Sequence, residues 1–598
     1  MQPKNKQRTM MKRNVLSILG MLMTAALQAA PVDITSQGGW LESGYVEWQK
    51  TAGLQYHVYV SGTDQESWTK LDDELVREYP DHGRADALGL KAGSYRFKVV
   101  PVSGTAEVTE DAATSEAVEV KAHDRSGFAH KRAGETGIGA YNHDGTLKQN
   151  ARVVYVWGDN AKTVSLDVAT NSSGKTATYK GLQQILYGYQ KGDANGSFDK
   201  RPLCIRIIGT IHASEMDEFL SSAEGLQIKG AKAYQKMNIT IEGVGNDATV
   251  WGFGFLVRNT ASVELRNFAI MWCMDDCISI DTKNESVWVH NIDLFYGQPG
   301  SDSDQVKGDG TIDMKGNSRY LTISYNHLWD SGKASLCGMK SETDPNYITY
   351  HHNWFDHSDS RHPRIRTMSV HVWNNYFDGN SKYGVGVTYG ASAFVENNHF
   401  RNCKYPMLIS LQGSDVAGGG KGTFSSENGG VIKSFGNAVT GATRLVTYQQ
   451  NATEWDCWEA VQRGDQVPAE VKAKAGGTGY DNFDTNSEVM YDYTPDAAAD
   501  VPAIVTGAYG AGRMQHGDFT WTFDNTTEDK NDGVIADLKS AVQSYKSAWL
   551  GFFGSNTGIH TVISDERPAA PVYDLQGRRV TKPGQRQIYI QDGKKRVW

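Results

Sequence analysis

Two hydrophobic patterns divide the chain. Over residues 32–121, apolar and polar residues alternate in short runs such as Tyr45-Val46-Glu47-Trp48 and Tyr95-Arg96-Phe97-Lys98-Val99. Alternation with a period of two places successive side chains on opposite faces of an extended strand, so each run fits a half-buried strand. The segment therefore predicts a small β-sandwich.

Over residues 127–549 the pattern changes to many short apolar runs without a helical period, for example Ile205-Arg206-Ile207-Ile208. The later runs are each followed by an asparagine, and these recur every 22 to 27 residues, at Asn326, Asn353, Asn375 and Asn398. One coil per recurrence is typical of a solenoid, so this region predicts a right-handed parallel β-helix in an all-β chain. The asparagines would stack on successive coils and bond one another through their amides.

Length, charge and cysteine content narrow the class of protein. A chain of 598 residues predicts two or three domains, and the net charge of -9 excludes the broad basic face of a nucleic-acid binder. The six cysteines are too few for a disulfide scaffold. Cys273 and Cys277 lack the second pair and the histidines of a zinc site, so no transition metal is expected.

The N-terminus predicts export. Lys12 and Arg13 precede an apolar run at residues 15–27 and the small residues Ala29 and Ala30, which is typical of a signal peptide over residues 1–30. Met11 is an alternative start. No other apolar run is long enough to cross a membrane. We therefore expect a secreted, periplasmic or cell-surface protein, monomeric and without a transmembrane segment.

Carboxylates and arginines concentrate in one stretch of the predicted solenoid. The acidic residues are Asp275, Asp276, Asp309 and Asp313, and the basic ones lie in Ser360-Arg361-His362-Pro363-Arg364-Ile365-Arg366. Carboxylate oxygens suit calcium or magnesium, whereas guanidinium groups suit carboxylates or phosphates of a partner. The pattern predicts a divalent cation and an acidic polymer at one site, with a solvated acidic loop as the alternative.

Several motifs of residues 123–555 occur together and in one order. They are Asp276-Cys277-Ile278-Ser279-Ile280, Val287-Trp288-Val289, Asp309-Gly310-Thr311-Ile312-Asp313-Met314-Lys315-Gly316, Leu321-Thr322-Ile323-Ser324-Tyr325-Asn326, Ile348-Thr349-Tyr350-His351-His352-Asn353 and the arginine motif above. In these motifs the region resembles the pectate lyase family, polysaccharide lyase family one. The resemblance implies calcium-dependent β-elimination on polygalacturonate, the de-esterified form of pectin.

The resemblance also implies roles for individual residues. Asp276, Asp309 and Asp313 match the positions that bind Ca²⁺. Arg361 matches the proton-abstracting base, and Lys333 and Arg366 match residues that hold substrate carboxylates. A guanidinium normally stays protonated, so the neighbouring cations must disfavour its charge, which predicts an alkaline optimum.

The sequence leaves the roles of some residues in this region open. Arg364 is expected either to face the substrate or to pair with a carboxylate, and His351 and His352 are expected to be structural. The family usually has Trp-Ile/Val-Asp-His where this chain reads Trp288-Val289-His290-Asn291. That departure puts local hydrogen bonding or a second metal site in doubt.

Two further resemblances concern the flanking regions. Leu90-Lys91-Ala92-Gly93-Ser94-Tyr95 resembles the tyrosine corner of fibronectin type III sandwiches, which predicts such a domain over residues 31–122. Of Trp40, Trp48 and Trp68, at least two are expected in its core rather than in a sugar platform. The segment 556–598 resembles the C-terminal sorting domains of exported Bacteroidetes proteins, with a plain terminal β-hairpin as the alternative.

Three other functions share parts of these patterns. A polygalacturonase-type hydrolase would use an acidic pair such as Asp275-Asp276, but its Gly-His-Gly motif is absent from the chain. A pectin lyase acting on methyl-esterified chains would lack the calcium carboxylates. A pectin-binding surface protein without activity would not need Arg361, so pectate lyase activity is the main hypothesis.

Overall fold

The structure is a computed structural model that describes residues 31–220, 222–417 and 424–553, together with four short strands between residues 572 and 597. The predicted signal peptide at 1–30 lies outside the described residues. Among the residues described, no helix combines the length and apolar character needed to cross a membrane.

The N-terminal region forms two antiparallel sheets packed face to face. In spatial order, the first contains β1 (Ile34–Gly39), β2 (Ser43–Gln49), β6 (His82–Leu88), β5 (Val76–Glu78) and β43 (Gly551–Phe552). The second contains β10 (Val118–Val120), β7 (Gly93–Ser103), β3 (Gln55–Gly62) and β4 (Thr69–Lys70), with β8 (Ala106–Glu107) and β9 (Ala113–Thr114) also on β7. The alternating residues of these strands fill the space between the sheets, as the pattern predicts.

Individual side chains match the expected sandwich. The Tyr95 hydroxyl donates a hydrogen bond to the Lys91 carbonyl at 2.8 Å, which is the bond of a tyrosine corner. Trp48 lies in the sandwich core, as expected, whereas Trp40 is buried in a separate cluster with Met514 of the returning chain. Trp68 is half-buried with the Lys98 ammonium 4.9 Å from its ring.

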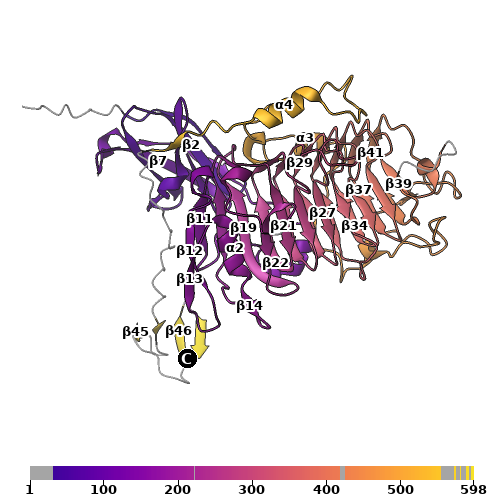
Figure 1. Ribbon diagram of the computed structural model, residues 1–598, viewed down its shortest axis with the longest axis horizontal. Coiled ribbons are helices and arrows are strands. Elements are labelled where there is room, and N and C mark those ends of the chain that lie inside the picture. The colour runs from indigo at the N-terminus through magenta and orange to yellow at the C-terminus, as the bar shows by residue number, and fades with distance from the viewer. Residues whose placement is uncertain are drawn as a thin grey trace, which may run out of the picture.

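Three parallel sheets follow, of eleven, nine and eight strands in the described part of the chain, and Figure 1 shows them stacked as the coils of a solenoid. The first parallel sheet contains β11 (Arg152–Val156), β16 (Leu203–Ile207), β19 (Gln235–Gly243), β22 (Thr260–Arg266), β25 (Glu285–His290), β28 (Arg319–Ser324), β31 (Ile348–His351), β34 (Ser369–Trp373), β37 (Ser392–Glu396), β40 (Val431–Phe435) and β42 (Trp458–Glu459). The second contains β17 (Thr210–His212), β20 (Thr249–Trp251), β23 (Ala269–Met271), β26 (Asp293–Leu294), β29 (His327–Trp329), β32 (Trp354–Asp356), β35 (Tyr376–Asp378), β38 (His399–Arg401) and β41 (Ala438–Thr440). The third contains β18 (Gly225–Lys229), β21 (Gly254–Arg258), β24 (Ile278–Asp281), β27 (Ile312–Lys315), β30 (Leu336–Cys337), β33 (Arg364–Arg366), β36 (Val385–Thr388) and β39 (Met407–Ile409). The parallel β-helix is thus confirmed.

The predicted asparagine stack lies between the first and second parallel sheets. The Asn353 Oδ1 atom accepts hydrogen bonds from the backbone and side-chain nitrogens of Asn326, both at 3.0 Å. The same pair of bonds joins Asn353 to Asn375 and Asn375 to Asn398, and one further step reaches Asn437. Each asparagine therefore satisfies backbone groups at a tight corner that the solenoid buries.

Helices and connections cover the outside of the solenoid. α1 (Phe128–Ala133) packs on the first parallel sheet, and α2 (Leu182–Gln190) buries Ile185, Leu186 and Tyr189 against the first coils. The last part of the chain, with α3 (Val501–Val505) and α4 (Ala536–Ser544), runs back along the solenoid toward the sandwich (Figure 1). Two small hairpins complete the described strands: β12 (Ser165–Ala169) with β13 (Thr176–Lys180), and β14 (Gly192–Asp193) with β15 (Gly196–Ser197).

The sandwich and the solenoid share one hydrophobic cluster. Its members include Val46, Trp48 and Phe97 from the sandwich and Tyr155 and Val244 from the first coils. Across the same boundary, the buried guanidinium of Arg77 lies 3.4 Å from Asp247. The strands therefore change from antiparallel to parallel after about residue 122, while hydrophobic side chains pack without a break across the boundary.

The remaining predictions concern cysteines and the C-terminus. Cys273 and Cys277 form a disulfide, and the other cysteines, all buried, are Cys204, Cys337, Cys403 and Cys457. Near the C-terminus, β44 (Val572–Tyr573), β45 (Arg579–Val580), β46 (Ile588–Gln591) and β47 (Lys594–Val597) form an antiparallel sheet. Short strands were expected there, whereas the sorting function remains a prediction.

Candidate functional site

An acidic cluster lies beside the third parallel sheet. Asp275 and Asp276 come directly before β24, and Asp309 comes shortly before β27. β24 and β27 pair in parallel with Ile278 opposite Ile312, so the residues that lead into the two strands meet. One carboxylate oxygen from each of Asp275, Asp276 and Asp309 lies within 4.8 Å of the others. We call these three residues the acidic cluster.

The acidic cluster carries more negative charge than its neighbours neutralise. Burial and the charge of nearby Asp313 raise the pKa of Asp276 to about 8, although Lys315 acts in the opposite direction. The Lys315 ammonium is 3.3 Å from Asp276. Burial and the charge of Asp309 likewise raise the pKa of Asp275. Crowded carboxylates that resist ionisation form a site that a hard cation such as Ca²⁺ stabilises.

Asp309 is tied to the next coil. Its carboxylate lies 2.7 Å from the Lys333 ammonium and also accepts a hydrogen bond from Gln305. Burial would raise the pKa of Asp309, but the bond and charge of Lys333, with the charge of Arg361, lower it overall. Asp309 therefore links the acidic cluster to the cations beyond it.

Asp313 is adjacent to the acidic cluster without belonging to it. Its Oδ1 accepts a hydrogen bond from the backbone nitrogen of Leu336 at 2.9 Å, and burial raises its pKa against the opposing charge of Arg361. A side chain at Gly310 would come within 2.5 Å of the Asp313 carboxyl group, so glycine leaves room for it. Of the three predicted metal ligands, the structure brings Asp276 and Asp309 together with Asp275 and leaves Asp313 beside them.

A row of cations continues along the same sheet. Lys333 bridges in parallel to Gly310 on one side and to Ser360 on the other, which places it one coil before the arginines. Arg361 has a left-handed backbone with φ of 64°, and Arg364 and Arg366 flank the buried Ile365 on β33. Alternate residues of a strand point to the same face, so both of these arginines leave the core together. We call Lys333, Arg361, Arg364 and Arg366 the cationic strip.

Glu427 occupies one end of the cationic strip. Its Oε2 atom lies 2.9 Å from Arg366 Nε and 3.4 Å from Arg364 Nη2, and it accepts a 2.8 Å hydrogen bond from Thr388. Lys340 approaches Oε1 at 3.1 Å. Although burial opposes it, these partners lower the pKa of Glu427 to about 2. Arg364 thus pairs with a carboxylate, one of the two outcomes expected for it.

Asp275 and Glu427 are the site residues that sequence reasoning missed. Asp275 had a signal, because it adjoins Asp276 in the acidic stretch that predicts a divalent cation, but the family resemblance gave the ligand role to Asp276, Asp309 and Asp313 alone. Glu427 had no signal, since it lies in an irregular segment between β39 and β40 and reaches β33 only through the fold. Glu427 and the arginines of β33 are about 60 residues apart in sequence, so no regular spacing in the sequence indicates that they pair.

The His290-Asn291 departure belongs to a different part of the coil. His290 ends β25 of the first parallel sheet, where its ring nitrogens lie 3.1 Å from Glu264 and 3.0 Å from Asn291. The Asn291 amide donates to the Gly510 carbonyl at 3.1 Å. The two residues are therefore hydrogen-bonded within the covered wall, whereas the acidic cluster adjoins the third sheet.

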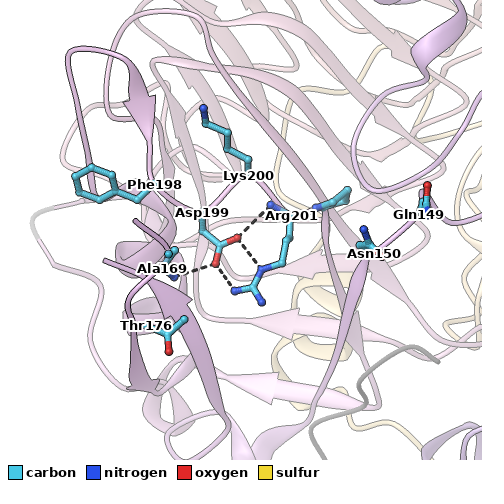
Figure 2. A pocket seen from close by; sticks show the side chains of 10 residues that line it. Gln149, Asn150, Ala169, Thr176, Phe198, Asp199, Lys200 and Arg201 are labelled. Atoms are coloured by element: carbon cyan, nitrogen blue, oxygen red, sulfur yellow. Dashed lines mark hydrogen bonds and ion pairs between the residues drawn. The ribbon is translucent and has the colours of Figure 1, made fainter. Parts of the chain in front are cut away.

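One pocket lies away from these groups. Figure 2 shows this cavity of about 430 Å³ near β12, with Asp199 and Arg201 at its centre. Their side chains bond each other at 3.0 and 2.6 Å, and Lys200 points away from the pair (Figure 2). Because the opposite charges neutralise each other, this pocket is a weaker candidate than the acidic cluster and the cationic strip.

Known proteins resemble the region of the chain that carries these groups. The family profile described as pectate lyase matches residues 113–456, which is more than half of the chain. A pectate trisaccharide-lyase of Bacillus licheniformis is 28% identical over 307 residues, covering 51% of this chain and 81% of that protein. Pectate lyase C of Dickeya chrysanthemi is 26% identical over 364 residues, covering 58% and 87%.

A solved structure of a pectate lyase from Bacillus sp. N165 in complex with trigalacturonate also matches, at 22% identity and a TM-score of 0.42, covering 65% of this chain and 99% of that one. A score this low adds nothing to the assignment. The family profile, which matches more than half of a chain folded as a parallel β-helix, does decide it: the chain belongs to the pectate lyase family.

Proposed function

We propose that this protein cleaves polygalacturonate by calcium-dependent β-elimination and releases unsaturated oligogalacturonates. One observation carries the proposal: carboxylates and then cations follow one another on successive coils of one sheet, in a chain of the pectate lyase family. An acidic polymer lying along the coils would meet a cation site first and fixed positive charges next. Such an order suits a substrate with one carboxylate on every sugar.

The acidic cluster is the proposed calcium site. Asp275, Asp276 and Asp309 offer hard oxygens within 4.8 Å of one another, and Asp275 and Asp309 are partly exposed, so water and substrate oxygens can complete the coordination. Asp313, which sequence reasoning included, adds negative charge beside them. When bound, calcium would supply positive charge next to the substrate carboxylate, where the reaction builds negative charge.

Arg361 is the proposed base. The reaction removes the proton α to the uronate carboxylate, after which the glycosidic oxygen leaves and a carbon–carbon double bond remains. Arg361 is half-buried and follows Ser360, which bridges to Lys333, and it precedes the strand that carries Arg364 and Arg366. Lys333 and Arg366 are proposed to hold substrate carboxylates, so that the scissile sugar faces Arg361.

A hydrolase would need a different arrangement. Glycoside hydrolysis uses two carboxyl groups on either side of the scissile bond, roughly 5 to 10 Å apart. Here the nearest acidic oxygens gather within 4.8 Å, which favours cation binding over paired acid–base catalysis. Polygalacturonate elimination is therefore preferred to hydrolysis.

An elimination assay tests the proposal. We expect ultraviolet-absorbing products from polygalacturonate with calcium, their loss with EDTA, and at least a hundredfold lower turnover in Arg361→Lys, which keeps the charge but loses the guanidinium. Arg132→Lys is the matched control, because Arg132 is an exposed arginine paired with Glu285 on the first parallel sheet. Undiminished cleavage after EDTA, or saturated products alone, would refute the proposal.

The accessory regions enter the proposal as well. We propose that residues 1–30 direct export, that 31–122 form a fibronectin type III-like sandwich on the solenoid of 123–555, and that 556–598 serve as a sorting segment. The two antiparallel sheets and the Tyr95 hydrogen bond support the second part. Detection of the protein without residues 1–30 in a culture supernatant or on the cell surface would test the export and sorting proposals.

A further inference from the structure

A second group of metal-binding side chains lies on the first parallel sheet. It consists of Asp124 in the connection after the sandwich and of His351 and His352 at the end of β31. One possible ligand atom of each residue lies within 4.8 Å of the others. The two Nδ1 atoms are 3.0 Å apart, and His351 Nδ1 is 3.9 Å from Asp124 Oδ2. The acidic cluster contributes nothing to this group.

The orientation of His352 is set from its far side. Its Nε2 lies 3.0 Å from the Asp496 carboxylate, which holds the ring proton on Nε2 and leaves the Nδ1 lone pair facing His351 and Asp124. Carboxylates that hold the other ring nitrogen in this way are typical partners of metal-bound histidines. Asp496 is therefore a positioning residue for His352.

Stacking fixes both imidazole planes. The His352 ring lies on Tyr325 with centroids 4.7 Å apart and planes at 4°, and the His351 ring lies on Trp373 at 4.7 Å and 13°. Both histidines are buried. Because neither ring can turn without losing its stacking partner, the two nitrogens are already directed at one point.

A cavity reaches Asp124 from outside. A hollow of about 360 Å³ is lined by Asp124 and Tyr325, by Leu41 of the sandwich region and by Tyr509 of the returning chain. The Asp124 Oδ2 atom accepts one distant hydrogen bond, from Tyr325 at 3.5 Å. An ion therefore has a route to the Asp124 side of the group.

The donor set selects the class of ion. Two imidazole nitrogens with one carboxylate suit zinc and other first-row divalent ions, whereas calcium takes oxygen ligands almost exclusively. A four-coordinate zinc ion about 2 Å from its ligands holds them roughly 3.3 Å apart, close to the separations seen here. We propose that Asp124, His351 and His352 bind Zn²⁺ or a chemically similar divalent ion, which fastens the connection after the sandwich to the wall of the solenoid.

This inference differs from the sequence expectation of no transition metal. That expectation considered the cysteines, and the tandem histidines gave no sign of a third ligand. Asp124 joins them only because residues 123–127 cross the first parallel sheet, where Phe128 N donates to the Thr349 hydroxyl at 3.1 Å. The proposal is independent of the reaction at the acidic cluster.

Metal titration of the full chain, without a polyhistidine tag, tests the site. We expect one equivalent of Co²⁺ to give the visible absorption of a tetrahedral nitrogen and oxygen site in the presence of excess Ca²⁺, and Zn²⁺ to displace it. Asp124→Asn keeps the shape and hydrogen bonding but removes the charge, so it should weaken Zn²⁺ binding at least tenfold. His352→Ala should abolish the absorption.

Two controls separate this site from others. His57→Ala removes a histidine that lies 2.6 Å from Glu107 in the sandwich and lacks a second imidazole, so it should leave the Co²⁺ spectrum unchanged. Asp276→Asn should weaken the dependence of polygalacturonate cleavage on calcium but leave the Co²⁺ spectrum unchanged. If Co²⁺ and Zn²⁺ bind without saturation, or equally well to Asp124→Asn, the group is a hydrogen-bonded cluster and the inference is wrong. Because Asp124→Asn preserves the shape of the side chain, its metal binding can be compared with that of the parent even if His352→Ala does not fold.

Discussion

At the scale of single residues, Glu427 has the most consequence for substrate binding. Its carboxylate lies among Arg364, Arg366 and Lys340, where the carboxylate of a uronic acid would be attracted. A half-buried carboxylate that pairs with two guanidinium groups neutralises much of their charge. Substrate carboxylates must therefore compete with Glu427 or share its cations.

Replacing Glu427 by glutamine tests this competition. The amide keeps the size of the side chain but releases the charge of Arg364, Arg366 and Lys340, so we expect a severalfold lower KM for polygalacturonate at low salt, with a smaller gain at high salt. Steady-state kinetics measures both. Glu285→Gln is the control, because Glu285 also pairs with two arginines, Arg132 and Arg319, on the first parallel sheet. A raised KM would instead mean that Glu427 positions the arginines.

Asp276 predicts how calcium binding depends on pH. The pKa of its carboxyl group is raised to about 8, so its ionisation without a cation costs folding stability as pH rises from about 4 through about 8. Calcium binds the ionised form, and its apparent affinity should therefore increase between pH 6 and pH 9. Thermal shifts with and without calcium at each pH measure the effect. In Asp276→Asn the increase should be much smaller, and an unchanged increase would exclude Asp276 as its source.

At the scale of elements, the asparagine stack is the regular feature that joins the coils. Asn375 donates to the carbonyl groups of Tyr350 and Trp373 and to Asn398, and it accepts from Asn353. Every one of these groups is buried, so removing the amide leaves several of them without partners.

Asn375→Ala should therefore destabilise the solenoid by about 1–3 kcal/mol, the usual cost of unsatisfied buried polar groups. Chemical denaturation monitored by tryptophan fluorescence measures the loss. Asn437→Ala serves for comparison, because Asn437 is half-buried at the end of the stack and should cost less. Equal losses at the two positions would show that the interior bonds add no stability.

The same elements show how far the sequence could be interpreted. Period-two alternation and the recurring asparagines predicted the sandwich and the parallel β-helix, because both depend on local spacing. The clustering of acidic and basic motifs predicted one site for carboxylates and arginines, and the family resemblance added Lys333 to it. Parallel pairing brings the segments that carry Asp309, Lys333 and Ser360 together on successive coils. Irregular segments, such as the one that contains Glu427, show no sequence period, so their contacts could not be predicted.

At the scale of the whole molecule, buried histidines predict sensitivity to acid. Burial lowers the pKa of His351 and of His362 to about 3, and it lowers those of His123 and His130 well below their ordinary value. The unfolded chain would bind protons at these histidines near pH 6.5, whereas the folded chain would not. Stability should therefore fall as pH drops from about 6.5 toward about 3.

Denaturation midpoints at pH 7, 5.5 and 4.5 check this expectation. His362→Gln keeps a donor for the Tyr383 carbonyl, which His362 Nδ1 approaches at 2.7 Å, and removes one titrating group. We expect a shallower fall in stability below pH 6.5 for this variant than for the parent. His57→Gln, which alters a half-buried histidine beside Glu107, is the comparison variant. Parallel curves for all three proteins would assign the acid sensitivity to carboxylates.

The pairing of β43 with β5 has a consequence for the order of folding. Gly551 and Phe552 complete the edge of a sheet in the N-terminal sandwich, which the ribosome makes first. Phe553 packs on Trp48 and Tyr56 in the core of that sandwich. A nascent chain on the ribosome consequently holds an unfinished N-terminal unit until every coil has emerged. β43 then completes the sheet begun by β1, so that loosening either of these two segments exposes the other.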